Sequence, residues 1–128
     1  MCTDWIQSDP PRPLTQRERD VVRYLLEPEF PGAAHLRKQV GPARVSGESR
    51  HCPTISFAVD REPTHRAAIS AGVVVETTNK HRYDSDDWVE LLLFLEDGWL
   101  SSLELVHYVN IPSELPPVTE LEPPRVRV

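Results

Sequence analysis

Glycine is scarce in this chain, with 5 glycines among 128 residues. Neither a Gly-x-Gly pattern nor a Walker motif is present. Loops that hold the phosphates of a nucleotide need such glycines, because backbone N–H groups must approach the phosphates closely. The sequence therefore argues against nucleotide binding.

Cysteine is also rare, since Cys2 and Cys52 are the only two, and two cysteines make no disulfide framework. So few cysteines are typical of proteins in a reducing cytoplasm, which is the location we expect. His51 and Cys52 precede a predicted strand and are the best candidates for a metal or thiol site, but no cysteine or histidine has the short spacing of a zinc site. We therefore predict no metal, no cofactor and an ordinary structural role for Cys52.

Long hydrophobic runs are missing as well, because Glu90, Glu96 and Asp97 interrupt the most apolar tract. No segment therefore reaches the length of a membrane span, and the polar start of the chain does not have the pattern of a signal peptide. The formal charge of −6 argues against nucleic acid, whose phosphates require a basic surface. The same charge is compatible with a basic protein as partner.

Two helical patterns occupy the first third of the chain. Thr15 and Glu18 have the spacing of a capping box, in which both side chains accept hydrogen bonds from backbone N–H groups. A helix is predicted from Thr15 to the break at Pro28, with valines and leucines as its inward stripe. Residues 33–40 predict a second, short helix with Leu36 and Val40 inward.

The rest of the chain has the patterns of strands. Residues 54–59 alternate, residues 68–78 are rich in β-branched side chains, and a short strand is expected at 44–45. The apolar tract 88–109 predicts two further strands joined by a turn at Asp97-Gly98. Because no helix separates the last four strands, we expect an α+β fold in which both helices pack on one face of an antiparallel meander of about four strands.

Prolines gather at both ends of the chain. Proline cannot donate a hydrogen bond to a strand ladder, which disfavours a central strand in either region. We therefore predict an irregular arm at residues 1–13, a single domain at 14–111 and an extended proline-rich tail at 112–128.

The apolar tract admits two hairpin registers. A two-residue loop at Asp97-Gly98 would put Glu104 on the apolar face, whereas a three-residue loop pairs Leu95 with Trp99. A one-residue slip moves every side chain to the other face, so burial should decide. We favour the three-residue loop because it collects the apolar side chains on one face. The apolar members of that inward face are Val89, Leu91, Leu93, Leu95, Trp99, Leu103, Leu105 and Val109.

This register also determines the outward face. Glu90 falls directly across from Glu104, and like charges in such a pair destabilise a sheet. The face is either simply solvated or an acidic and aromatic surface kept for a cationic partner. The candidate partner-binding residues are Asp84, Asp86, Asp87, Trp88, Glu90, Glu104 and Tyr108.

Residues 93–104 contain the pattern LF-x-x-DG-x-L-S-x-LE, and shorter motifs occur at 14–18, 30–39 and 52–55. Together these motifs resemble a small, uncharacterised actinobacterial protein family whose signature is an LLF-x-x-DG-x-L-S-x-LE hairpin. The resemblance covers about residues 14–117. Some members belong to the same class of small acidic proteins as the immunity partners of bacterial toxins, so the resemblance implies an immunity-type role.

The sequence thus predicts a non-enzymatic protein-binding module, specifically an immunity-type inhibitor that covers a basic toxin or nuclease with its acidic and aromatic sheet face. An enzyme is not expected, because no catalytic motif is present. The alternative is a structural, self-associating domain. In that case the apolar members of the outward face, Leu92, Phe94, Leu100 and Val106, form the seam of a homodimer.

Overall fold

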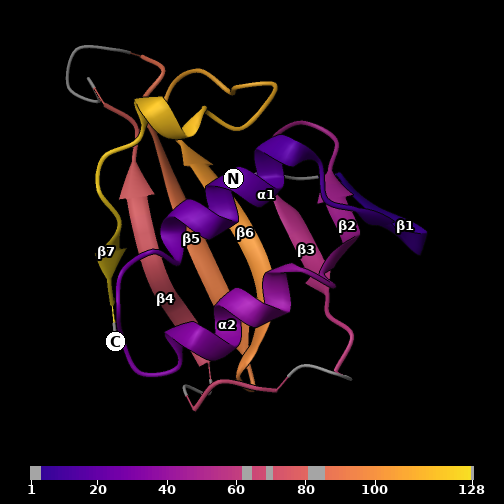
Figure 1. Cartoon of the computed structure of the whole chain (residues 1–128). Helices are drawn as coiled ribbons and strands as arrows, with labels where there is room; N and C mark the ends of the chain where they lie inside the picture. Colours follow the sequence, from indigo (N-terminus) through magenta and orange to yellow (C-terminus); the bar gives the residue numbers. More distant parts are fainter. Residues whose placement is uncertain (1–3, 62–64, 69–70, 81–85, 128) are drawn as a thin grey trace.

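A computed structural model describes residues 4–61, 65–68, 71–80 and 86–127. In these residues two helices and seven strands form an α+β fold, with both helices on one face of the sheet (Figure 1). The two α-helices are α1 (Gln16–Leu25) and α2 (Ala33–Val40), and a short 3-10 helix, η1 (Val118–Glu120), lies near the C-terminus. The strands are β1 (Trp5–Pro13), β2 (Arg44–Ser49), β3 (Ile55–Ala58), β4 (Ala71–Thr78), β5 (Val89–Glu96), β6 (Trp99–His107) and β7 (Arg125–Val126).

The two predicted helices are confirmed. At the start of α1 the Thr15 hydroxyl accepts a hydrogen bond from the Glu18 backbone N–H, and the Glu18 carboxylate accepts one from the Thr15 N–H at 2.8 Å. The helix ends before Pro28, which cannot continue it. From α2, Arg37 donates to three carbonyl groups that follow α1, those of Leu26, Glu27 and Pro28. These carbonyls have no partner within the helix, so Arg37 fixes the end of one helix from the other.

The strand order is β1-β2-β3-β6-β5-β4-β7, with every neighbouring pair antiparallel. The predicted meander is wrong at one step, because β3 lies beside β6 and not beside β4. The long connection from β3 to β4 crosses the tip of the β5–β6 hairpin, where the Ala67 N–H donates to the Gly98 carbonyl at 2.8 Å. The sheet therefore consists of two three-stranded meanders side by side, with β7 at the far edge.

The sheet is larger than the predicted four strands, partly because the N-terminal arm is not irregular. Residues 5–13 form the edge strand β1, which pairs with β2. Its register shifts between Gln7 and Arg12, and Pro10 and Pro11 fall inside that irregular part. Proline is tolerated there because an edge strand has one side without a ladder.

The C-terminal segment is not the predicted tail. Leu115 and Leu121 are buried in the core, and β7 pairs with β4 through Val126 opposite Val75 and Arg125 opposite Glu76. The prolines at 123 and 124 directly precede this two-residue strand. The segment therefore covers the edge of β4 that would otherwise expose unpaired backbone groups.

The turn between β5 and β6 has two residues, so the predicted three-residue loop is wrong. Glu96 pairs with Trp99, and between them Asp97 and Gly98 have φ values of 51° and 80°. Two successive residues in the left-handed region are typical of the type I′ turn that closes tight hairpins. The Asp-Gly pair supplies this conformation at little cost.

A bulge in β6 then buries the same leucines that the predicted three-residue loop would have buried. The pairing shifts by one residue at Ser101, so that Leu93 faces Leu103 and Leu91 faces Leu105, and all four leucines are buried. Three residues near the ends of the strands differ from the prediction. Trp99 is half-buried and Val109 exposed in place of inward, and Leu100 is buried in place of outward.

The hydrophobic core fills the space between the helices and the sheet. Its fully buried side chains include Val21, Val22, Leu25, Leu26, Leu36, Val40, Leu91, Leu93 and Leu103. Within the described ranges, none of the helices combines the length and apolarity needed to cross a membrane. No helix of the described residues covers the other side of the sheet, which we call the open face (Figure 1).

Candidate functional site

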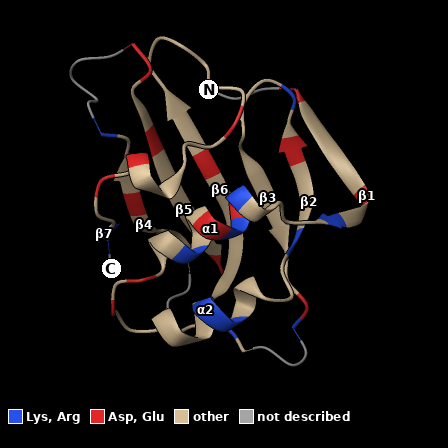
Figure 2. Ribbon diagram, turned by 45° about the horizontal axis from the view of Figure 1, so that its top comes forward, with Lys and Arg blue, Asp and Glu red and all other residues tan. Residues whose placement is uncertain are grey.

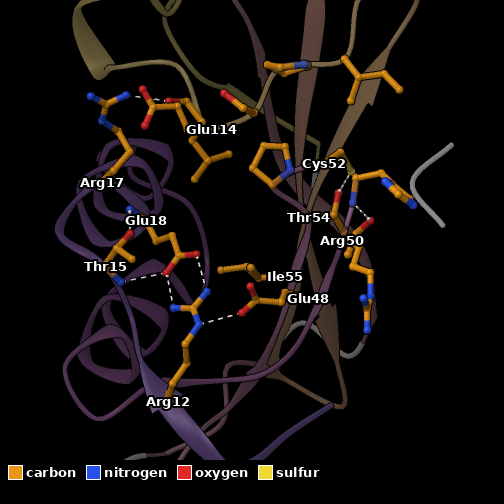
Figure 3. A pocket seen from close by; sticks show the side chains of 17 residues that line it. Arg12, Thr15, Arg17, Glu18, Glu48, Arg50, Cys52, Thr54, Ile55 and Glu114 are labelled. Carbon is orange, nitrogen blue, oxygen red and sulfur yellow. Dashed lines mark hydrogen bonds and ion pairs between the residues drawn. The ribbon is translucent and has the colours of Figure 1, made fainter. Parts of the chain in front are cut away.

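The structure offers two places for a site: a cavity on the helix side and the open face. The cavity has a volume of about 620 Å³ and lies between the start of α1, the β2–β3 turn and residues 111–115 (Figure 3). At one side of it the Arg12 guanidinium forms a hydrogen-bonded pair with Glu18, both contacts at 2.9 Å, and a 2.7 Å contact with Glu48. This cluster joins β1, α1 and β2.

Each charge within this cluster has a partner of opposite sign, because one guanidinium contacts two carboxylates. Burial raises the pKa of Glu18, but hydrogen bonds from Arg12 and Thr15 outweigh burial and hold the pKa below its ordinary value. The hydrogen bond to Glu18, assisted by Glu48, raises the pKa of Arg12. The guanidinium also donates to the Pro13 carbonyl at 2.9 Å. Arg12 is therefore committed to holding three elements together. The lining of the cavity contains three arginines and three glutamates, so neither sign of charge is in excess there.

His51 and Cys52 both line this cavity. The His51 Nε2 lies 2.6 Å from an Asp4 carboxylate oxygen. Cys52 is disulfide-bonded, so it has no thiol to act as a nucleophile or ligand, and the chain's other cysteine, Cys2, lies outside the described residues.

On the open face, the ends of β5 and β6 form an aromatic pair. The Trp88 and Tyr108 rings are stacked, with centroids 4.2 Å apart and an angle of 20° between planes. The Tyr108 hydroxyl donates a hydrogen bond to the Glu90 carboxylate, and this bond is the main cause that raises the pKa of Tyr108. Trp88, Glu90 and Tyr108 therefore form one contact group, which we call the aromatic–acidic corner. The prediction also put these residues on one face of the sheet.

Glu104 lies on the same face but not where the prediction placed it. It is opposite Leu92, and Glu90 is opposite Val106, so the predicted direct pair of Glu90 and Glu104 is wrong. The two-residue turn and the bulge at Ser101 are the reason, because each shifts the pairing by one residue relative to the predicted register. Glu104 accepts a hydrogen bond from the Ser102 hydroxyl at 3.1 Å.

The remaining predicted site residues are in the β4–β5 connection. Asp84 lies outside the described residues, whereas Asp86 and Asp87 are exposed. Asn110, just beyond β6, donates to the Asp86 carbonyl at 3.0 Å and to the Asp87 carboxylate at 2.9 Å. These contacts place both aspartates at the same end of the sheet as the aromatic–acidic corner.

Two further aromatic residues make contacts that were not predicted. The Trp5 indole covers Gly47, where an added Cβ would lie only 2.5 Å from the indole nitrogen. The Arg61 guanidinium lies 4.9 Å from the centre of the Trp99 ring. Sequence reasoning missed Trp5 because it lay in a presumed arm, and Trp99 because the wrong register turned it inward.

No protein-family model matches this chain, and neither a curated protein nor a solved structure matches it. The resemblance to the actinobacterial hairpin family therefore stays a prediction.

Proposed function

We propose that this protein is a non-enzymatic binding module whose open face covers a cationic surface of another protein. The observation that carries the proposal is the aromatic–acidic corner, Trp88, Glu90 and Tyr108, at the edge of the open face. In its specific form the partner is a basic toxin or nuclease, and the protein is its immunity-type inhibitor. The family resemblance is the support for that specific form.

The distribution of charge favours a cationic partner. On the helix side, Arg17, Arg19 and Arg37 donate to backbone carbonyls at 2.6 to 3.3 Å, so they serve as structural links. On the open face, neither Glu90 nor Glu104 forms an ion pair within the described part of the chain. Figure 2 shows acidic bands on β4, β5 and β6, whereas α1 carries both acidic and basic bands and α2 a basic one. On β4 the acidic residue Glu76 is paired with Arg125 and Arg127, so Glu90 and Glu104 carry the argument.

The apolar residues of the open face favour a protein and not a small ion. Leu92, Phe94 and Val106 are half-buried along β5 and β6. Tyr108 is 49% exposed and Val109 62% exposed at the same end. Aromatic side chains surrounded by a polar rim are typical of the few residues that contribute most of an interface's binding energy.

The test uses charge reversal on the two sides of the molecule. Immobilised protein is incubated with an extract of the source cells, and bound proteins are identified by mass spectrometry. We expect a basic protein whose capture is lost with Glu90→Lys and Glu104→Lys and weakens with salt. Glu114→Lys is the matched control, because it makes the same change in net charge beside α1 on the helix side.

Capture that survives both open-face reversals, or that is lost equally with Glu114→Lys, would contradict the proposal. In the first case the partner uses another surface. In the second case only net charge matters.

Self-association is the second candidate, favoured by the apolar row of Leu92, Phe94 and Val106. A two-fold dimer through this face would bring like charges of Glu90 and Glu104 from both copies close together. Light scattering separates the candidates. A dimer that Phe94→Asp converts to a monomer supports self-association, and a monomer at all concentrations leaves the open face for another protein.

A further inference from the structure

The aromatic–acidic corner has an aromatic side chain that remains partly accessible. Trp88 and Tyr108 stack on each other across the ends of β5 and β6. Tyr108 is nevertheless 49% exposed, so about half of this residue stays open to solvent beside the stacked pair. An exposed aromatic face carries the negative side of the ring quadrupole, which attracts cations.

A carboxylate lies at the edge of this ring. The Tyr108 hydroxyl donates to one oxygen of Glu90, which leaves the other carboxylate oxygen for a further donor. Asp87 lies at the same end of the sheet, linked to the chain beyond β6 through Asn110 at 2.9 Å. A group that stacked on Tyr108 would therefore meet negative charge at its edge.

The same molecule contains a filled example of this arrangement. Arg61 lies 4.9 Å from the centre of the Trp99 ring, beside a cleft of about 460 Å³ that Glu96 and Asp97 also line. Here an aromatic ring near carboxylates holds a planar guanidinium of the chain itself. The Tyr108 ring has the same kinds of neighbours, and no guanidinium of the described residues lies on it.

We propose that the aromatic–acidic corner is the site that receives an arginine side chain of the partner. This inference rests on the proposed function and specifies which residue the partner presents. Arginine fits better than lysine because its flat guanidinium can stack on the ring while an N–H group at its edge donates to the remaining oxygen of Glu90. The ammonium of lysine offers a point charge without a plane to stack.

The experiment titrates the full chain with hexa-arginine and, separately, with hexa-lysine, followed by nuclear magnetic resonance. We expect the ring signals of Tyr108 and the indole signal of Trp88 to shift, with hexa-arginine binding at least about threefold more tightly. Tyr108→Leu should remove this preference, because it removes the stacking surface. Tyr108→Phe should retain it, because it removes only the hydroxyl.

The outcomes separate this inference from the proposed function. Equal binding of the two peptides, unchanged by Tyr108→Leu, would overturn the arginine site and leave an open face that attracts cations by charge alone. Binding of neither peptide to the open face would overturn the arginine site and also count against a cationic partner. Heteronuclear spectra of each variant confirm that it is folded, so a loss of binding can be assigned to the side chain.

Discussion

Gln39 is a fully buried amide that joins α2 to the tip of the β5–β6 hairpin. Its side-chain nitrogen donates to the Gly98 carbonyl at 3.1 Å and to the His65 carbonyl at 2.9 Å, and its oxygen accepts from the Leu100 N–H at 2.9 Å. The helical stripe identified Leu36 and Val40 as inward, and both are buried. A glutamine beside such a stripe is ordinarily solvated. The burial of Gln39 therefore could not be predicted without knowing that the β5–β6 turn packs against it.

Replacing this amide should therefore be costly. Gln39→Leu keeps the approximate volume but leaves the backbone groups it served without partners, and we expect a loss of about 3 kcal/mol in the free energy of unfolding. Urea denaturation measures it. Lys38→Ala, at an exposed neighbour on the same helix, should change stability by less than about 0.5 kcal/mol. Equal effects of the two substitutions would show that the amide contacts contribute little.

Glu18 gives the molecule an acid-sensitive contact. Its pKa is held below the ordinary value of 4.5, so the folded form binds a proton less readily than the unfolded form. The contribution to stability is therefore complete above pH 4.5 and is lost as pH falls below it. We expect Glu18→Gln to flatten the acid side of the stability profile, measured by thermal unfolding between neutral and acidic pH. Glu114→Gln is the control, and it should leave the acid slope unchanged. If Glu18→Gln also leaves the slope unchanged, the slope belongs to other carboxylates.

At the scale of elements, the β5–β6 hairpin shows what a sequence pattern can and cannot determine. The Asp-Gly pair located the turn, and the alternation of leucines identified the buried face. The pattern offered two uniform registers, and the molecule uses neither alone, because a two-residue turn is followed by the bulge at Ser101. In the sequence, a bulge of one residue appears only as a one-residue shift in the alternation of apolar and polar side chains. That shift cannot be told apart from a different loop length.

Gly98 should be the most sensitive residue of that turn. Its φ is +80°, and an added Cβ would lie 2.4 Å from the Ala67 carbonyl oxygen. Gly98→Ala therefore combines a strained backbone with a steric clash, and we expect a loss of at least about 2 kcal/mol in unfolding free energy. Gly72→Ala isolates the first cause, since its φ is +97° and no described atom lies within 4 Å of the added group. It should cost about 1 kcal/mol. A smaller loss at Gly98 than at Gly72 would contradict the close approach of Ala67.

The C-terminal segment should contribute to stability as part of the core. Leu121 is 2% exposed, and its neighbour Glu122 donates a backbone hydrogen bond to the Thr78 carbonyl at 2.8 Å. We expect Leu121→Ala to lower the free energy of unfolding by about 2 to 4 kcal/mol in a denaturant titration. Ile111→Ala, at a residue that is 51% exposed, should have little effect. A frayed tail, in contrast, would make both substitutions neutral.

At the scale of the whole molecule, the α+β class, the two helices and the common face of the helices were predictable from periodicity and capping. The two edge strands were not, because prolines at residues 1–13 and 112–128 conceal strands that need a ladder on one side only. The neighbour of β3 was also unpredictable, since nothing in the local pattern shows that a connection will pass two strand positions. Within the described ranges, the predicted partner-binding residues lie on the open face or at one end of the sheet. The sequence shows why, because these residues either alternate with the buried leucines or directly flank them.

Binding of a cationic partner to the open face is tested most directly by measuring the affinity for the captured partner. Isothermal titration calorimetry compares the unaltered protein with Glu104→Lys and Glu114→Lys, which change net charge equally on opposite sides of the sheet. We expect Glu104→Lys to weaken binding by at least about tenfold and Glu114→Lys to leave it within about twofold. Equal affinities for the two variants would show that the partner does not bind the open face.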